Sequence, residues 1–562
     1  MRVPLDRLLL LLPLALGVWL CADLAALWAA RLGHPFDLEW MEGGVLVHAW
    51  RLAAGEPIYV EPSPDFVPMI YPPGYPALLA ALGGVFGLGH PLGRAVSLLG
   101  TLAAAAALVW FAHRDLRRAD LGLLAAFVWL GTYRATGGFF DLVRADALMV
   151  GLLAWSVVLA ASPSGRSRAV AGLLLALAYT TKQNAAAFGP GLLALVAARH
   201  GAGAGVRFAL WSAVPAGAYT AWMQWQTDGL FLTYLVGVPR SHPLVGDRVW
   251  PGTFRELGGA LPAALAVVTA ALILDVKRLA SAAPSTAAGA VALGGGLTAA
   301  IATQLPAIRG ISSHAAWQEA LGAAQPGVIA ALVLVLLAAA VAARGNSEPK
   351  EQVAIRFGAA LTLLWATAWL LAALMRGHHG GFINVFMVLF WGICAALVLG
   401  SARLWTHLPR VGPGLVCLGV AAQLHLSHRD LNPNELRPHP DDRMAGEALV
   451  RELAALPGPV WSPIAPWLAV QAGHRPGPHL IALWDVIHPD SPFPHQRGVF
   501  QAAIAGRHWK TVVDGRPSLG MGLPRHYEAV HTAPIAGRTL MPRTGWRRRP
   551  QVLLAPLPKE SP

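Results

Sequence analysis

Cysteine and charge are both scarce in this chain. Three cysteines, Cys21, Cys394 and Cys417, occur in 562 residues, and all three lie within apolar runs. None of them forms a CxxC pair, so the sequence indicates neither a disulfide framework nor a cysteine metal site. Charged residues make up 13% of the chain, 55% is hydrophobic, and the mean hydropathy is +0.50. This balance excludes an ordinary soluble protein and predicts many membrane spans of about 20 apolar residues each.

Signatures of nucleotide and nucleic-acid binding are also missing. The polar C-terminal part has no Gly-rich dinucleotide motif and no P-loop, and no internal repeat is evident. The net charge of +13 does not indicate nucleic acid, because arginine and lysine stand mostly between apolar runs. We therefore expect the basic residues to orient the chain in a membrane, and we expect no nucleic-acid partner.

The apolar runs predict an all-α polytopic membrane protein. They fall near residues 8–30, 74–89, 93–113, 119–134, 146–162, 168–181, 185–198, 207–226, 259–275, 286–306, 323–343, 356–375, 382–400 and 411–426. Prolines and glycines at both ends shorten the run 74–89 to about 14 helical residues, too few to cross. If that run lies along the outer interface, every predicted inner loop is short and basic, as the positive-inside rule requires. We therefore predict about 13 spans, with the amino terminus in the cytoplasm.

The composition changes near residue 427, where the chain becomes rich in proline, histidine and other polar residues. We predict a transmembrane domain at 1–426, whose outer loop 31–92 holds juxtamembrane helices, and an extracytoplasmic α/β domain at 427–562. Within the second domain, the patterns predict helices at Met444–Leu456 and Val499–His508, and short strands at Pro459–Trp461 and His479–Trp484.

Ionisable side chains gather on the predicted outer face, where their cost in a membrane makes them candidates for function. A shielded carboxylate can deprotonate a hydroxyl as a general base, and nearby cations can stabilise a departing phosphate. Glu42 is the first candidate base and Glu39 the second, while Asp146 would orient substrate hydroxyls. The candidates for substrate binding are Tyr71, Arg144, Lys182, Arg376, His378, His379 and Asn384.

Each candidate also has a purely structural interpretation. Glu42 would serve equally as a solvated loop acid or as a helix amino-terminal charge, and Asp146 as a helix start paired with Arg144. Lys182 would simply reach the lipid headgroups. Tyr71 fits an interfacial aromatic belt, with stacking on a sugar as the alternative.

A metal site at the paired histidines His378 and His379 is disfavoured, because adjacent side chains point in different directions. We predict no metal-ligating residue, and the sequence leaves open whether a divalent cation assists the reaction.

Several short motifs, taken together, resemble bacterial GT-C membrane glycosyltransferases, in particular the group of protein O-mannosyltransferases and lipid A aminoarabinose transferases. The resemblance covers roughly the first two hundred residues. One departure concerns Met41, since such enzymes often carry an Asp-Glu pair where this chain has Met41 and Glu42, and this leaves the base open between Glu42 and Glu39. The motifs are Glu39–Gly44, Gly55–Tyr59, Tyr71–Tyr75, Gly93–Arg94, Arg144–Asp146 and Thr181–Gln183.

The resemblance implies a sugar donor linked to polyprenyl phosphate, inversion at the anomeric carbon, and an essential acid in each of the first two outer loops. Carried over to this sequence, these acids are Glu42 and Asp146. The expected partners are the donor, membrane lipids and an envelope glycan, lipid or protein as acceptor. The expected location is the inner (plasma) membrane, with the active site and the C-terminal domain outside. The main alternative is a lipid or solute transporter or flippase, which would place its polar site near the bilayer midplane in broken helices.

Overall fold

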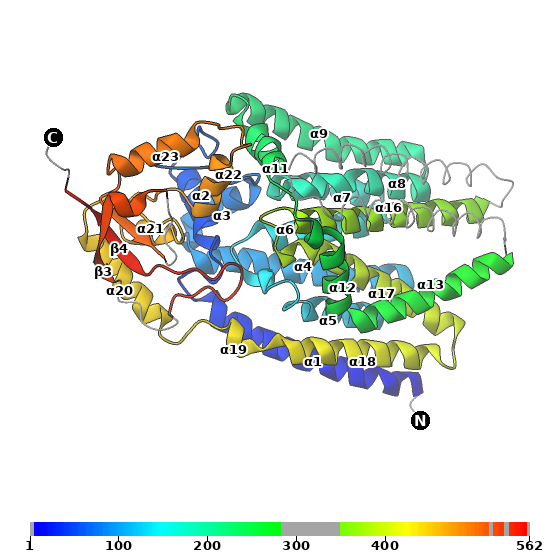
Figure 1. The fold of residues 1–562 in the computed structure, drawn as a ribbon. Helices are drawn as coiled ribbons and strands as arrows, with labels where there is room; N and C mark the ends of the chain where they lie inside the picture. The colour runs from blue at the N-terminus through cyan, green and yellow to red at the C-terminus, as the bar shows by residue number, and fades with distance from the viewer. Residues whose placement is uncertain (1–4, 283–348, 516–520, 533–538, 559–562) are drawn as a thin grey trace.

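The structure is a computed structural model that describes residues 5–282, 349–515, 521–532 and 539–558. Within these ranges it is a bundle of long helices with a small sheet near the C-terminus (Figure 1). This confirms the predicted class, an all-α membrane bundle followed by a small α/β part. The spans predicted at 286–306 and 323–343, and the loop 307–322 between them, lie outside the described residues.

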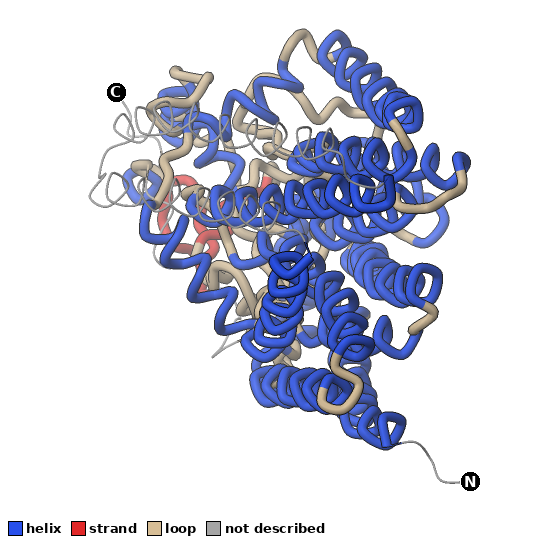
Figure 2. The backbone as a smooth tube through the Cα atoms, turned by 90° about the vertical axis from the view of Figure 1, so that its right-hand side faces the viewer, coloured by secondary structure: helices blue, strands red, loops and turns tan. Residues whose placement is uncertain are grey.

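Long helices form the bundle, and Figure 2 shows it turned by 90°, with the strands behind the helices. Length and apolar composition alone mark three stretches in the described ranges as able to cross a membrane: Leu8–Leu32, His90–Leu116 and Ile383–His407. Every predicted run within the described residues is helical, but the exact number of spans stays a prediction. The bundle helices are α1 (Leu5–Leu32), α4 (His90–Leu116), α5 (Ala119–Gly131), α6 (Ala145–Ala160), α7 (Gly165–Thr181), α8 (Gly189–His200), α9 (Ala202–Gln226), α13 (Pro262–Ala282), α16 (Pro349–Gly377), α17 (Met387–His407) and α18 (Gly412–Leu431).

Two short helices lie in the loop 31–92, and its place outside the membrane stays a prediction. Helix α2 spans Glu42–Ala53, and α3 spans Gly74–Phe86. The 13 residues of α3 rise about 20 Å, less than the roughly 30 Å of a bilayer core. A Cβ atom at Gly74 would lie 2.4 Å from the Thr180 carbonyl oxygen, so glycine lets α3 begin directly against the end of α7.

The basic loops predicted to face the cytoplasm meet at one end of the bundle. Arg199 lies 3.8 Å from Asp115, which joins the loop after α8 to the loop after α4. The Arg118 guanidinium stacks over the Trp405 ring at 4.2 Å, which brings the end of α17 to the same place. The predicted inner connections after α4, α8 and α17 therefore lie at the same end of the bundle, and the side of the membrane that they face stays a prediction.

Short helical segments connect the longer ones. Between α9 and α13 the chain forms several single turns, and 3₁₀ turns precede α6, α8 and α17. These segments are η1 (Phe139–Asp141), η2 (Gln183–Phe188), α10 (Leu230–Leu232), η3 (Thr233–Gly237), α11 (Val238–Ser241), η4 (Arg248–Gly252), α12 (Thr253–Ala260), η5 (Ile383–Phe386) and α19 (Pro433–Leu436).

The C-terminal part contains a four-stranded sheet in the order β1-β2-β4-β3. Strands β1 and β2 are parallel, the other pairs are antiparallel, and a register shift between Ala529 and His531 interrupts the β3–β4 pair. The elements are α20 (Asp442–Ala455), β1 (Val460–Trp461), α21 (Trp467–Gln471), α22 (Leu480–Ile487), α23 (Gln496–Ala505), β2 (Thr511–Asp514), η6 (Leu523–Arg525), β3 (Tyr527–Thr532) and β4 (Val552–Pro556).

The structure confirms the predicted helices at α20 and α23 and the strand at β1, but the strand predicted at His479–Trp484 is wrong. That segment begins helix α22. The His479 side chain caps this helix by accepting a hydrogen bond from the Ile481 backbone N–H at 3.1 Å. A short apolar run does not by itself distinguish a strand from a buried helix, and here the cap decides.

The C-terminal part packs on the loop 31–92. Phe36 of that loop belongs to the same buried cluster as Leu449, Val460 and Leu553. The Gln471 side chain donates a hydrogen bond to the Pro35 carbonyl. The loop that carries the predicted acids therefore lies between the bundle and the sheet (Figure 1).

Candidate active site

A pocket of about 440 Å³, counting the open space at its mouth, lies where α2, α3, α6 and the end of α7 meet. It brings together residues from segments far apart in the sequence, including four of the predicted site residues. Cationic, anionic and aromatic groups share a largely apolar wall. The lining residues are Val45, His48, Ile58, Met69, Tyr71, Pro72, Tyr75, Pro76, Arg144, Ala145, Asp146 and Lys182.

Asp146 organises one side of this pocket. It lies in the first turn of α6 and is 3% exposed. Its Oδ1 accepts hydrogen bonds from Lys182 Nζ at 2.6 Å and from Asn384 Nδ2 at 2.9 Å. Lys182 ends α7 and Asn384 lies in η5, so Asp146 connects three elements. A lysine buried this deeply needs its paired carboxylate, because an unpaired buried charge is costly.

Arg144 lies between two carboxylates, immediately before α6. Its Nη1 donates to Glu39 Oε2 at 3.0 Å, and its Nε lies 4.0 Å from Asp146 Oδ2. The same Nη1 contacts Met41 Sδ. The Tyr71 ring lies 5.9 Å from this guanidinium and 5.5 Å from the Lys182 ammonium. Two cations thus flank one aromatic ring at the pocket wall.

Glu42, the first candidate base, is fully buried and saturated with hydrogen bonds. Its Oε1 accepts from Arg94 Nε at 3.0 Å and from the Val143 N–H at 2.8 Å. Its Oε2 accepts from Arg94 Nη2 at 2.8 Å and from the N–H groups of Leu38 and Glu39. Glu42 and Arg94 are both 0% exposed. Neither Glu42 nor Glu39, which is 1% exposed, lines the pocket.

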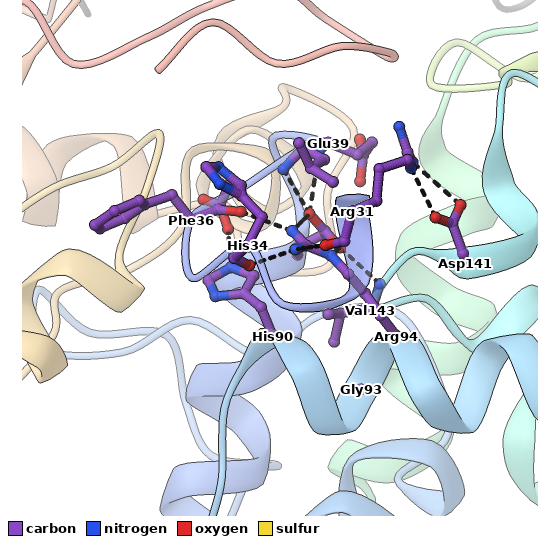
Figure 3. Close-up of polar contacts among 12 residues, drawn as sticks. Arg31, His34, Phe36, Glu39, His90, Gly93, Arg94, Asp141 and Val143 are labelled. Atoms are coloured by element: carbon purple, nitrogen blue, oxygen red, sulfur yellow. Dashed lines mark hydrogen bonds and ion pairs between the residues drawn. The ribbon is translucent and has the colours of Figure 1, made fainter. Parts of the chain in front are cut away.

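Arg94 extends the same network to the end of α1 and the loop after it. It donates to the carbonyl oxygens of Arg31, His34 and Phe36, as Figure 3 shows. The Glu42–Arg94 pair therefore fastens the first loop to α4 and, through Val143, to the second loop. This arrangement fixes loop geometry and leaves no free lone pair in the described contacts of Glu42 for a substrate.

The two glutamates differ in acidity. Burial raises the pKa of Glu39, the nearby Arg144 charge opposes this only in part, and the pKa reaches about 7. Burial also acts to raise the pKa of Glu42, but the Arg94 charge and its hydrogen bonds outweigh it and bring the pKa to about 2. A general base works best with a pKa near the operating pH, which favours Glu39.

Asp37, Glu42 and His90 form a metal-like cluster, with ligand atoms within 4.8 Å of one another. His90 Nε2 lies 2.6 Å from Asp37 Oδ1. Burial raises the pKa of Asp37, and its hydrogen bond to His90 opposes this. Both oxygens of Glu42 already accept from the Arg94 guanidinium, whose charge repels a cation. These donors do not suit a divalent metal.

Four predicted binding residues do not line the pocket: Asn384, which donates to Asp146, and Arg376, His378 and His379. Arg376 ends α16 and makes a forked ion pair with Glu256 of α12, with contacts of 2.8 to 3.1 Å. His378 lies 3.0 Å from His242 Nδ1, and the His379 N–H bonds to the Pro243 carbonyl. The Arg376 and His378 side chains therefore contact the segment between α11 and α12 or α12 itself, whereas His379 is exposed.

The sequence reasoning missed the partner of Glu42. Arg94 entered only as part of a resemblance, although a lone arginine early in an apolar helix is itself a signal for a buried counter-charge. It also missed His48, which lines the pocket and accepts from the Met69 N–H at 2.9 Å. No motif marks His48, because its role depends on the return of the 57–71 segment.

Comparisons with known proteins give a distant structural likeness. No protein-family model matches the chain, and no curated protein aligns with it. Two solved structures of ArnT from Cupriavidus metallidurans align over 96% of this chain and 97% of theirs. The apo form has 15% identity and a TM-score of 0.39, and the form bound to undecaprenyl phosphate has 14% and 0.43. At these values the likeness concerns the general course of the chain, and the chemistry must be argued from the site.

Proposed function

We propose that this chain is a membrane glycosyltransferase that moves a sugar from a polyprenyl-phosphate-linked donor to a cell-envelope acceptor outside the membrane, with inversion at the anomeric carbon. The observation that carries the proposal is the meeting of Arg144, Asp146 and Lys182 beside Tyr71 in one pocket. These residues come from the segments whose motifs resemble GT-C glycosyltransferases.

Arg144 and Lys182 would hold the donor phosphate. Lys182 has three N–H donors, and Asp146 takes one of them. Charge-assisted hydrogen bonds from both cations would stabilise the negative charge that develops on the leaving phosphate. Asp146 and Asn384 keep the ammonium in place before the donor arrives.

Glu39 would be the general base, in place of the first candidate Glu42. Glu39 contacts Arg144, so it lies beside the phosphate-binding cations. It would take the proton from an acceptor hydroxyl as that oxygen attacks the anomeric carbon. The bond from the anomeric carbon to the phosphate oxygen breaks, and polyprenyl phosphate leaves with the electron pair. Glu42 would act through Arg94 as a positioning residue for this loop.

The same arrangement accounts for the departure in the first-loop motif. Met41 stands where related sequences often have an aspartate, and Arg144 Nη1 contacts both Met41 Sδ and Glu39 Oε2. Glu39 therefore supplies a carboxylate at the place that Met41 leaves without one. The basic loops at the opposite end of the bundle support an extracytoplasmic site by the positive-inside rule.

Reconstitution in liposomes with undecaprenyl-phospho-sugars carrying labelled glucose, mannose or aminoarabinose tests the proposal. We expect one donor to release undecaprenyl phosphate when an envelope extract supplies the acceptor. Lys182→Met should reduce this release at least tenfold, whereas the exposed Lys510→Met should leave it unchanged. Movement of the intact lipid across the bilayer without sugar transfer would refute the proposal and favour a flippase.

A further inference from the structure

Three tryptophans from distant parts of the chain meet beside Glu39. Trp40 belongs to the first outer loop, Trp484 to α22, and Trp546 to the segment before β4. The ring centroids of Trp40 and Trp546 lie 5.1 Å apart, those of Trp484 and Trp546 5.3 Å, and those of Trp40 and Trp484 6.4 Å. We call these three rings the indole cluster.

Two of the three rings are open on one side. Trp484 is 40% exposed and Trp546 is 37% exposed, while Trp40 is 8% exposed and forms the base of the cluster. Large apolar rings that converge on an otherwise polar part of a protein commonly mark a binding surface. None of the three tryptophans lies in one of the long apolar helices that could cross a membrane.

Polar partners hold the rings in place. His479 bonds to the Trp40 carbonyl oxygen at 2.9 Å, and its ring lies 5.1 Å from the Trp40 ring. The Arg548 guanidinium stacks 5.1 Å from the Trp546 ring, and Asp514 accepts from that guanidinium at 3.3 Å. The indole cluster is therefore preorganised, which lowers the entropic cost of binding a rigid ligand.

The cluster and the proposed base meet at one point in the C-terminal segment. The Arg543 N–H donates a hydrogen bond to the Leu38 carbonyl oxygen at 2.8 Å, and Thr544 forms an isolated parallel β-bridge with Glu39. Within the described residues, the Glu39 carboxylate accepts hydrogen bonds from the Met41 N–H and from Arg144 Nη1, both on Oε2. A Cβ atom at Gly545 would lie 2.8 Å from Oε1, so a residue without a side chain covers this oxygen, next to Trp546.

We propose that the indole cluster binds a sugar ring of the acceptor, so that the acceptor of this enzyme is a carbohydrate. The inference rests on the proposed function. The C–H face of a pyranose is apolar and stacks on indole, while its edge carries hydroxyls that can reach a carboxylate. Glu39 adjoins the cluster, and the nearby Arg543 and Arg548 already pair with aspartates, which favours this ligand over an anionic headgroup. The exposed Arg547, next to Trp546, is the cation that the lipid experiment below must test.

Saturation-transfer NMR on the full-length protein in nanodiscs, with methyl glucoside, methyl galactoside and methyl mannoside as probes, tests the inference. We expect saturation to reach ring protons of at least one probe. The double variant Trp484→Ala/Trp546→Ala should bind that probe roughly tenfold more weakly. The matched control Trp222→Ala/Trp225→Ala removes two exposed rings of α9 and should leave binding unchanged. No transfer to any probe, or equal transfer in the double variant, would overturn the inference.

A second measurement separates a sugar site from a membrane belt. The emission of a single tryptophan is the difference between the fluorescence of the wild type and that of its Trp→Phe variant. In vesicles of brominated phosphatidylcholine, the lipid should quench the emission of Trp546, obtained with Trp546→Phe, far less than the emission of Trp225, obtained with Trp225→Phe. Equal quenching would place Trp546 in lipid and overturn the inference. Thermal stabilisation by undecaprenyl phosphate, unchanged in the double variant, reports the donor site separately. If probes bind but the lipid phosphate does not, the proposed function fails while the cluster remains a carbohydrate site.

Discussion

Substituting glutamine for Glu42 tests whether this acid holds the first loop in place. The change keeps the size of the side chain but removes the charge opposite Arg94, which is 0% exposed. An amide has one acceptor oxygen, so its NH₂ group must face donors on one side, either Arg94 Nε and Val143 N–H or Arg94 Nη2 and the N–H groups of Leu38 and Glu39. Breaking one partner out of a buried ion pair costs about 3–5 kcal/mol.

Hydrogen exchange with mass spectrometry can measure this cost locally. If the pair limits opening of the loop, amides in peptides 33–43 and around Val143 should exchange between about a hundredfold and a few thousandfold faster in Glu42→Gln. The matched control Glu39→Gln should change these rates by a few-fold at most, although we expect it to abolish sugar transfer.

A double variant makes the test quantitative. Adding Arg94→Gln to Glu42→Gln removes the uncompensated guanidinium, so the double variant should lose less protection than the sum of the two single variants. Exchange in Glu42→Gln within threefold of the wild type would refute the holding role. Full transfer activity in Glu39→Gln, with loss in a still-protected Glu42→Gln, would return the base role to Glu42.

Three further predictions concern other contacts. Because burial raises the pKa of Glu39 from 4.5 to about 7, transfer should fall as the pH drops through 7, and any residual rate of Glu39→Gln should lose this dependence. Protonated Glu39 stabilises the folded state; this contribution is fully present below pH 4.5 and is lost as the pH rises through 7. At pH 8, Glu39→Gln should therefore have a higher melting temperature than the wild type. Gly545→Ala should reduce transfer at least tenfold with a small fall in the melting midpoint, because the φ of Gly545 is +71° and its Cβ would lie 2.8 Å from Glu39 Oε1; wild-type activity would contradict the role of this carboxylate as the base. Arg376→Met should cost about 1 kcal/mol of stability through Glu256 but leave the affinity for undecaprenyl phosphate unchanged, and weaker lipid binding would restore its predicted role in the site.

Much of the site is local information and could be predicted from the sequence. Asp146 and Lys182 stand at the ends of apolar helices, where the cost of burying a charge singles them out, and the structure brings them to 2.6 Å. Tyr71 and Arg144 join them in the same pocket. The chemistry of these side chains in transfer stays a prediction.

The sequence by itself determined a helical membrane chain with an acidic first loop and a polar C-terminal part, because apolar length and period are properties of neighbouring residues. The tertiary structure decided which acid has free capacity. Glu39 and Glu42 are three residues apart, yet Arg94 saturates one and Arg144 touches the other. It also joined Trp40 to rings more than 400 residues away. Partners so distant are chosen by packing, which no local pattern encodes.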